Sequence, residues 1–229
     1  MEIVLIAGLW LDATAWDPVT RELERLGHRP IPVTLPGQGD GSSSATLQDQ
    51  VDAVTRAVQE ATAPVMVVGH SAACSLAWAA TDAQPEKVSA TVMIGGFPAA
   101  DGQTYADFFP VTAGAVPFPG WEPFAGPDSA DLDQAMRKRI AESAHPVPEA
   151  VTRGVMRLRD ERRFGVPVVL VCPEYTPAEA REWLEAGQMP ELSRAERVDY
   201  VGLDSGHWPM FSQPVQLAQI LAALTAARA

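Results

Sequence analysis

The fold is decided by one stretch of the chain, Val65-Met66-Val67-Val68-Gly69-His70-Ser71-Ala72-Ala73-Cys74. Its apolar first half is typical of a strand buried on both faces, and the second half leads directly into helical spacing. A sharp turn between such a strand and helix would hold the Ser71 hydroxyl at the edge of a sheet, where it can act as a nucleophile. Gly69 and Ala73 are small enough for the close backbone approach that this turn needs. A helix N-cap is the alternative role for this serine.

Other apolar segments along the chain predict further strands of the same kind. We expect the strands at residues 3–7, 30–35, 64–69, 90–95, 166–171 and 198–203. Helical spacing lies between and after them, at Trp16–Leu26, Leu47–Ala61, Ser75–Ala83, Pro177–Ala186 and Val215–Ala227. This alternation predicts one α/β domain over residues 1–229, with a doubly wound, mostly parallel six-stranded sheet and helices on both faces.

Residues from about 97 to 165 interrupt the alternation, because prolines and glycines are frequent there. The segment also carries many aromatic residues and has helical spacing at Ser129–Ser143. We expect a lid or cap inserted over the carboxyl edge of the sheet, where open α/β sheets bind ligands. A surface loop packed on the core is the alternative.

Composition and charge narrow the classes of partner. The chain has a formal charge of −12, which disfavours nucleic acid or an anionic membrane and favours a neutral or cationic small molecule. Cys74 and Cys172 are expected to be buried thiols without a disulfide. We expect a cytoplasmic protein, since the sequence starts directly with a strand pattern and has no apolar run of membrane-spanning length. The oligomeric state is left open.

A histidine follows the last expected strand, in Asp204-Ser205-Gly206-His207-Trp208-Pro209. A loop between the last strand and the terminal helix is the place of the base in enzymes with this chain order, so His207 is the expected partner of Ser71. Hydrogen bonding to the backbone of its own loop is the alternative role.

The turn after the first strand, Ala7-Gly8-Leu9-Trp10, is the third candidate feature. In this position a backbone N–H can stabilise an oxyanion together with the N–H of the residue after the nucleophile. We therefore expect Leu9 and Ala72 to supply the two donors. An apolar substrate pocket is expected from Trp10, Trp121, Phe124 and Trp208.

Together these motifs resemble the α/β-hydrolase superfamily, and in particular its small, cofactor-free esterases. Leu35-Pro36-Gly37-Gln38-Gly39 and Gly206-His207-Trp208-Pro209 are similar to turns of those enzymes. The chain departs from the family pattern at Ala73, where Gly-x-Ser-x-Gly has its second glycine, and at Ala7, where many members have histidine. The resemblance implies a catalytic triad without cofactor or metal.

The third member of that triad is not at either of its usual places, which fall on Thr176 and Gly95. The nearest acids are Glu174 and Asp101. We favour Glu174, because it lies between Ser71 and His207 in chain order and its longer side chain can compensate for an earlier position. Asp101 is the alternative, and a chain without an orienting acid is a third possibility.

The expected function is hydrolysis of a carboxylic ester, thioester or lactone of a small, largely apolar substrate through an acyl-enzyme. Two alternatives remain open at this point: a lyase or cofactor-free haloperoxidase using the same serine, and a ligand-binding protein without turnover. The histidines are too scattered in the sequence to suggest a metal site. A solvated helical face is expected for the basic residues Arg157, Arg159, Arg162 and Arg163.

Overall fold

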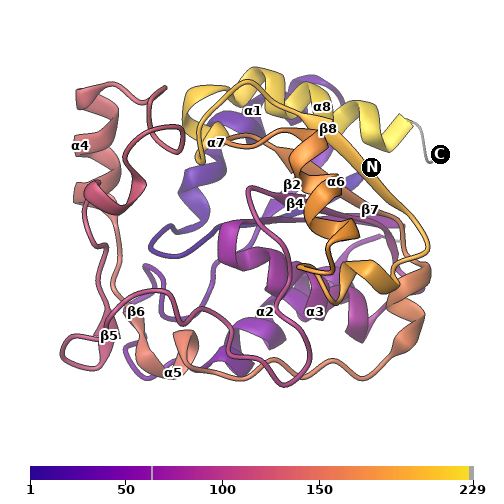
Figure 1. Cartoon of the computed structure of the whole chain (residues 1–229), viewed down its shortest axis with the longest axis horizontal. Coiled ribbons are helices and arrows are strands. Elements are labelled where there is room, and N and C mark those ends of the chain that lie inside the picture. The colour runs from indigo at the N-terminus through magenta and orange to yellow at the C-terminus, as the bar shows by residue number, and fades with distance from the viewer. Residues whose placement is uncertain (63, 227–229) are drawn as a thin grey trace.

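The computed structural model describes residues 1–62 and 64–226 and is built around a six-stranded parallel sheet (Figure 1). The strand order is β2-β1-β3-β4-β7-β8. The strands are β1 Glu2–Ile6, β2 Arg29–Pro32, β3 Val65–His70, β4 Val88–Ile94, β7 Val168–Cys172 and β8 Val198–Gly202. β3 lies in the middle of this order, so its carboxyl end, where Ser71 follows, is flanked by strands on both sides.

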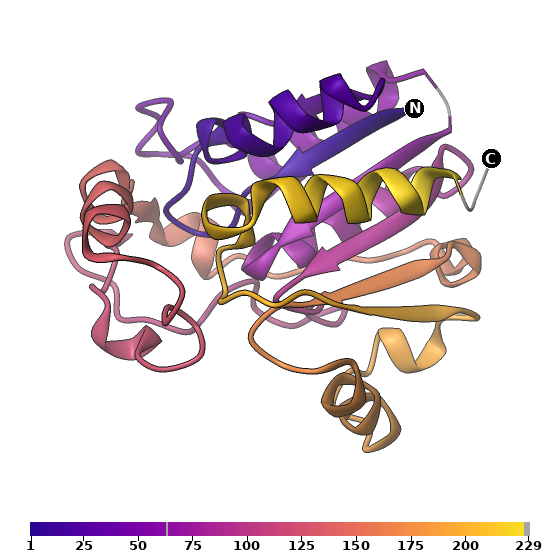
Figure 2. The ribbon, with the colours of Figure 1, turned by 90° about the horizontal axis from the view of Figure 1, so that it is seen from above.

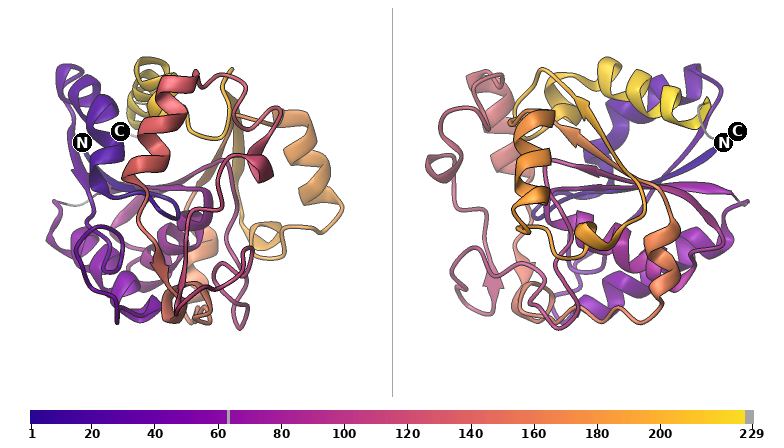
Figure 3. Two further views of the ribbon diagram at one scale, coloured as in Figure 1. Left: turned by 90° about the vertical axis from the view of Figure 1, so that its left-hand side faces the viewer. Right: turned by 45° about the vertical axis from the view of Figure 1, so that its right-hand side comes forward.

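Apolar side chains on both faces of the strands hold the sheet between two layers of helices. Val4 and Ile6 belong to a buried cluster that includes residues of α2 (Leu47–Glu60) and α3 (Cys74–Ala83). Ile3 and Leu5 point the other way, into a cluster with residues of α1 (Asp17–Arg25) and α8 (Pro214–Ala226). Figures 2 and 3 show the sheet between these layers, and α6 (Pro177–Glu185) packs beside β7 and β8.

The predicted fold class is confirmed, with shifts of a few residues at element ends. β2 stops at Pro32, three residues early, although the N–H of Val33 still donates to the Leu5 carbonyl at 2.9 Å. The first predicted helix begins as a 3-10 turn, Ala13–Trp16, because the Asp12 side chain accepts a hydrogen bond from the Thr14 N–H and caps it. The last predicted residue of the terminal helix, Ala227, lies outside the described residues.

The segment 97–165 adds small elements outside the central sheet. They are β5 Ala115–Val116, η3 Glu122–Phe124, α4 Gln134–Ser143, β6 Val147–Pro148, α5 Glu149–Thr152 and η4 Glu161–Gly165. β5 and β6 form an antiparallel pair that the sequence pattern did not predict. This pair and α4 lie at one end of the molecule (Figure 1). The expected helix Ser129–Ser143 starts later, at Gln134, because the Asp133 side chain caps it by accepting from the Met136 N–H.

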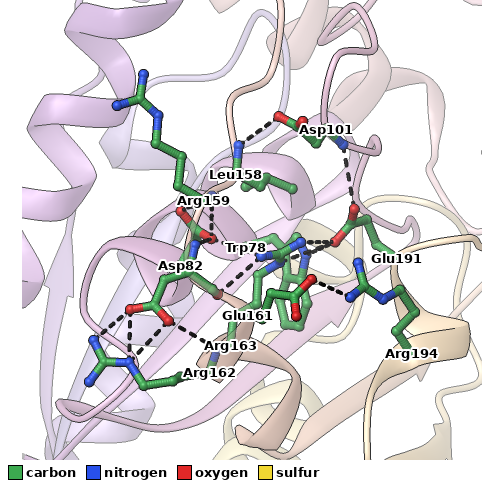
Figure 4. A network of polar contacts seen from close by, with 11 residues as sticks. Trp78, Asp82, Asp101, Leu158, Arg159, Glu161, Arg162, Arg163, Glu191 and Arg194 are labelled. Carbon is green, nitrogen blue, oxygen red and sulfur yellow. Dashed lines mark hydrogen bonds and ion pairs between the residues drawn. The ribbon is translucent and has the colours of Figure 1, made fainter.

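A buried ionic network fixes the end of this segment to the core, and it corrects the prediction of a solvated arginine face (Figure 4). The Arg163 side chain is only 3% exposed. Its guanidinium donates to Asp82 Oδ1 at 3.0 Å and to Glu191 Oε2 at 2.9 Å. Glu191 Oε2 also accepts from the Trp78 indole at 3.0 Å. α3, η4 and the turn at η5 (Leu192–Arg194) are thereby joined by one side chain.

We expect Arg163→Met to lower the free energy of unfolding by about 3–5 kcal/mol, because it leaves two buried carboxylates without their cation. Arg162→Met is the matched control, since the Arg162 side chain is exposed and its ion pairs are worth at most about 1 kcal/mol. Urea unfolding of both variants measures the difference. Equal losses in the two variants would show that the buried network does not stabilise the fold.

Candidate active site

Ser71 occupies a backbone conformation that few non-glycine residues adopt. Its φ is 55°, in the left-handed region, at the junction of β3 and the 3-10 turn Ser71–Ala73 that leads into α3. Two glycines make room for this turn. A Cβ at Gly69 would collide with the Ala73 carbonyl, and one at Gly96 would lie 2.8 Å from the Ser71 carbonyl oxygen. Strain that is held in place by close packing is typical of functional positions.

The structure brings Ser71 and His207 together from opposite ends of the chain. Ser71 Oγ and His207 Nε2 are 2.9 Å apart, within hydrogen-bonding distance. The His207 loop is held by the segment 97–165, since the His207 N–H donates to the Asp128 carbonyl at 2.7 Å and the Gly206 N–H to Asp131 Oδ2 at 2.7 Å. The base is therefore positioned partly by the inserted segment.

Glu174, rather than Asp101, lies against the other nitrogen of His207. The distance from His207 Nδ1 to Glu174 Oε1 is 2.7 Å. With Nδ1–H donating to this carboxylate, Nε2 is left free to accept the serine proton. Asp101 is occupied elsewhere, because its Oδ1 accepts from the Leu158 N–H at 2.9 Å (Figure 4).

The residues at the two usual places of the orienting acid, Thr176 and Gly95, explain why Glu174 can fill that role. Thr176 caps α6 by accepting from the Glu179 N–H. Gly95 has a φ of 60°, and a Cβ there would lie 3.2 Å from His207 Nδ1 and 3.3 Å from Glu174 Oε2. The absent side chain at Gly95 therefore leaves the space that the Glu174 carboxylate reaches into.

His70 joins the loops around Ser71, a role that the sequence did not reveal. Its Nε2 lies 2.7 Å from the His207 carbonyl oxygen and donates to it. Its Nδ1 faces the turn after β1, so that a Cβ at Gly8 would lie 2.8 Å away. Burial, together with the nearby His207, lowers the pKa of His70 to about 3, so its imidazole is neutral. The sequence feature that could have indicated this role is the presence of a polar residue at the end of a fully apolar strand.

The turn that carries Leu9 is supported by a buried glutamine from the Leu35–Gly39 motif. Gln38 Nε2 donates to the Gly8 carbonyl at 3.0 Å and to the Leu11 carbonyl at 2.7 Å. Trp10, next to Leu9, has a left-handed φ of 68°. Leu9 and Ala72 both border the space around Ser71, and their role as oxyanion donors stays a prediction.

Ser71 opens into a small cavity of about 180 Å³, here called the aromatic cavity. It is lined by Leu9, Trp10, His70, Ser71, Phe108, Phe109, Phe124, His207 and Trp208. The structure thus places the predicted pocket residues Trp10, Phe124 and Trp208 here, and adds Phe108 and Phe109. Trp121 is not in the lining; its ring contacts that of Trp208 edge-on, with 5.2 Å between the ring centroids.

The family model described as "Alpha/beta hydrolase family" matches residues 3–220 of this chain. The chain belongs to that family. A protein of Arabidopsis thaliana named as a chloroplastic methylesterase 12 is 31% identical to this α/β-hydrolase over 114 residues, which is 47% of the chain. The match spans only 33% of the length of that relative.

Solved structures share the fold of this α/β-hydrolase at low sequence identity. An extracellular α/β-hydrolase from a Paenibacillus species has a TM-score of 0.79 and 19% identity, covering 97% of this chain and 98% of its own. A methylesterase from Arabidopsis has a TM-score of 0.74 and 16% identity, with 99% of each chain covered. A pyrethroid hydrolase from Sphingobium faniae has a TM-score of 0.68 and 21% identity, covering 99% and 98%.

Across residues 1–62 and 64–226, no three His, Cys, Asp or Glu side chains are grouped so that they could hold a metal ion. None of the helices in those ranges has the length and apolar character needed to cross a membrane.

The buried His70 of this α/β-hydrolase should make stability depend on pH. Between its folded pKa of about 3 and its ordinary value of 6.5, the unfolded chain binds a proton that the folded protein does not. The stabilisation of the fold by neutral His70 is therefore fully present above pH 6.5. As the pH falls below that value, the free energy of unfolding decreases by roughly 1.4 kcal/mol per pH unit. His70→Gln keeps an N–H for the His207 carbonyl but cannot titrate. Urea unfolding between pH 7 and pH 4 should show a shallower loss in this variant, and parallel curves would contradict the assignment.

Proposed function

We propose that this α/β-hydrolase is a carboxylesterase-like serine hydrolase that cleaves a carboxylic ester of a small, largely apolar substrate. One observation carries the proposal: hydrogen-bonding distances connect Ser71, His207 and Glu174 at the edge of the aromatic cavity. A thioester or lactone offers the same electrophilic carbonyl and belongs to the same substrate class. The substrate is the expected partner, and no step requires a cofactor.

The three side chains have complementary roles in this reaction. Ser71 Oγ attacks the ester carbonyl while its proton passes to His207 Nε2. Glu174 holds His207 in the required tautomer and stabilises the imidazolium that forms. His207 then gives the proton to the leaving alcohol, and a water molecule activated by the same histidine releases the acyl group from Ser71. The N–H groups of Leu9 and Ala72 are the proposed donors to the oxyanion.

The surroundings of Ser71 support an apolar substrate. The rings of Phe109 and Phe124 lie 5.2 and 6.0 Å from that of Trp10, and Phe124 contacts Trp208 at 5.1 Å. We propose that the segment 97–165 acts as a lid, because Phe108, Phe109 and Phe124 come from it and line the cavity together with Ser71. Closing such a site excludes water, which strengthens the electrostatic interactions at the reacting carbonyl.

The comparisons support hydrolysis over binding without turnover. The chain belongs to a hydrolase family, and a methylesterase and a pyrethroid hydrolase are among the proteins that share its fold. The alternative of a ligand-binding protein rested on the apparent lack of an orienting acid. Glu174 supplies a carboxylate 2.7 Å from His207, which removes that support.

A fluorophosphonate probe and a short-chain nitrophenyl ester test the nucleophile. The parent protein should be labelled and should release nitrophenol, whereas Ser71→Ala and His207→Ala should lose at least about 10³-fold in kcat. Intact-protein mass spectrometry and an absorbance assay measure the two readouts. Labelling without turnover of any ester would contradict the esterase proposal and favour a lyase or haloperoxidase that uses the same serine.

A pair of isosteric variants tests the orienting acid. Glu174→Gln should lower kcat by up to about 10⁴-fold with little change in KM, because a neutral amide no longer holds the Nδ1–H tautomer of His207. Asp101→Asn is the matched control and should retain the parent kcat, since Asp101 contacts the Leu158 backbone and not His207. Loss of kcat in the Asp101 variant alone would reverse the assignment.

A further inference from the structure

A second pocket adjoins Ser71, apart from the aromatic cavity. It has a volume of about 370 Å³, roughly twice that of the aromatic cavity. We call it the side pocket, and it is lined by Ser71, Ala72, Ser75, Gly95, Gly96, Phe97, Pro98, Ala99, Gln103, Thr104, Tyr105 and Phe108. Among the residues that the structure describes, only Ser71 and Phe108 line both spaces. The nucleophile therefore lies at the junction of a small and a larger pocket.

Two polar groups in the wall of the side pocket already have partners in the protein, whereas the buried Tyr105 hydroxyl has no hydrogen-bond partner among the described residues. The buried Ser75 Oγ accepts from the Ala99 N–H at 3.0 Å, and Gln103 Oε1 accepts from the Ala100 N–H at 2.9 Å. These bonds fix the wall rather than offering open acceptors. Phe97 and Phe108 are partly exposed, so the pocket also presents apolar surface to an entering molecule.

The two pockets also differ from charged binding sites in the side chains that line them. None of the described residues that line either space carries a carboxylate, ammonium or guanidinium group. Nearby, Glu174 is bonded to His207 through one of its two oxygens, and Asp107 is paired with Arg153. A charged substituent would leave water for a wall that offers no counter-charge, which costs more free energy than an uncharged one of equal size.

The oxyanion candidates lie on the two sides of this junction. Leu9 lines the aromatic cavity and Ala72 lines the side pocket. A carbonyl held by both N–H groups would have its carbon near Ser71 Oγ, with one substituent directed into each space. Both halves of an ester can therefore be accommodated, but only the side pocket has room for a large group.

We propose, on the basis of the proposed ester hydrolysis, that the substrate is an uncharged, unequal ester that lies across Ser71. A compact group of about the size of one aromatic ring occupies the aromatic cavity. A bulkier, uncharged group occupies the side pocket and contacts Phe97 and Phe108 at its rim.

A panel of synthetic esters tests the size and charge limits. Neutral esters with one benzyl-sized group and one bulkier group should be cleaved, and esters with two bulky groups should lose at least about 100-fold in kcat/KM. Placing a carboxylate or a quaternary ammonium on the bulky group should cost at least about 100-fold relative to the neutral ester of matched size. Equal kcat/KM across the panel would overturn the inference while leaving ester hydrolysis intact.

Variants locate the bulky group. Ala99→Trp narrows the side pocket, and Gln103→Trp does so from an exposed position, in case the first variant fails to fold. Either should lower kcat/KM for the bulky ester at least about 10-fold more than it lowers kcat/KM for nitrophenyl acetate or the rate of fluorophosphonate labelling. Ala150→Trp is the control, because Ala150 lines a surface pocket that does not include Ser71.

The outcomes separate this inference from the proposed function. Tryptophan variants that are labelled normally and still cleave the bulky ester at the parent rate would show that the side pocket does not hold it. A parent protein that is neither labelled nor active on any ester would instead overturn the proposed function, and this inference with it.

Discussion

The site depends on one constrained turn, in which β3 ends at His70 and Ser71 is held with a φ of 55°. An L-residue adopts this conformation at a cost, so the surrounding backbone has to hold it there. Gly69 and Gly96 make this possible, because a side chain on either would collide with the turn or press against it. The parallel strands on both sides of β3 keep the turn at the carboxyl edge of the sheet.

The other reacting groups reach Ser71 through contacts that depend on this turn. His70, the residue before it, donates to the His207 carbonyl and packs close to Gly8. The His207 loop is also bound by Asp128 and Asp131 of the inserted segment, and that segment supplies much of the aromatic lining. Positioning of the base and enclosure of the proposed substrate site are thus structurally connected.

The sequence predicted what local patterns determine. Strand and helix periodicity gave the α/β sheet, and chain order singled out Ser71 and His207. Glu174 could be favoured but not distinguished from Asp101, because the space left by Gly95 exists only after folding. The displaced Trp121, the short β5–β6 pair and the burial of Arg163 share this reason: each depends on partners distant in the chain.

Proton transfer from Ser71 requires that His207 is held with its proton on Nδ1, between Glu174 and Ser71. Nitrogen-15 NMR of histidine-labelled protein near pH 8 tests it directly, because protonated and unprotonated ring nitrogens have different chemical shifts. We predict Nδ1–H with an unprotonated Nε2 for His207, and loss of this preference in Glu174→Gln. A His207 that carries its proton on Nε2, or whose tautomer is the same in both proteins, would contradict the account.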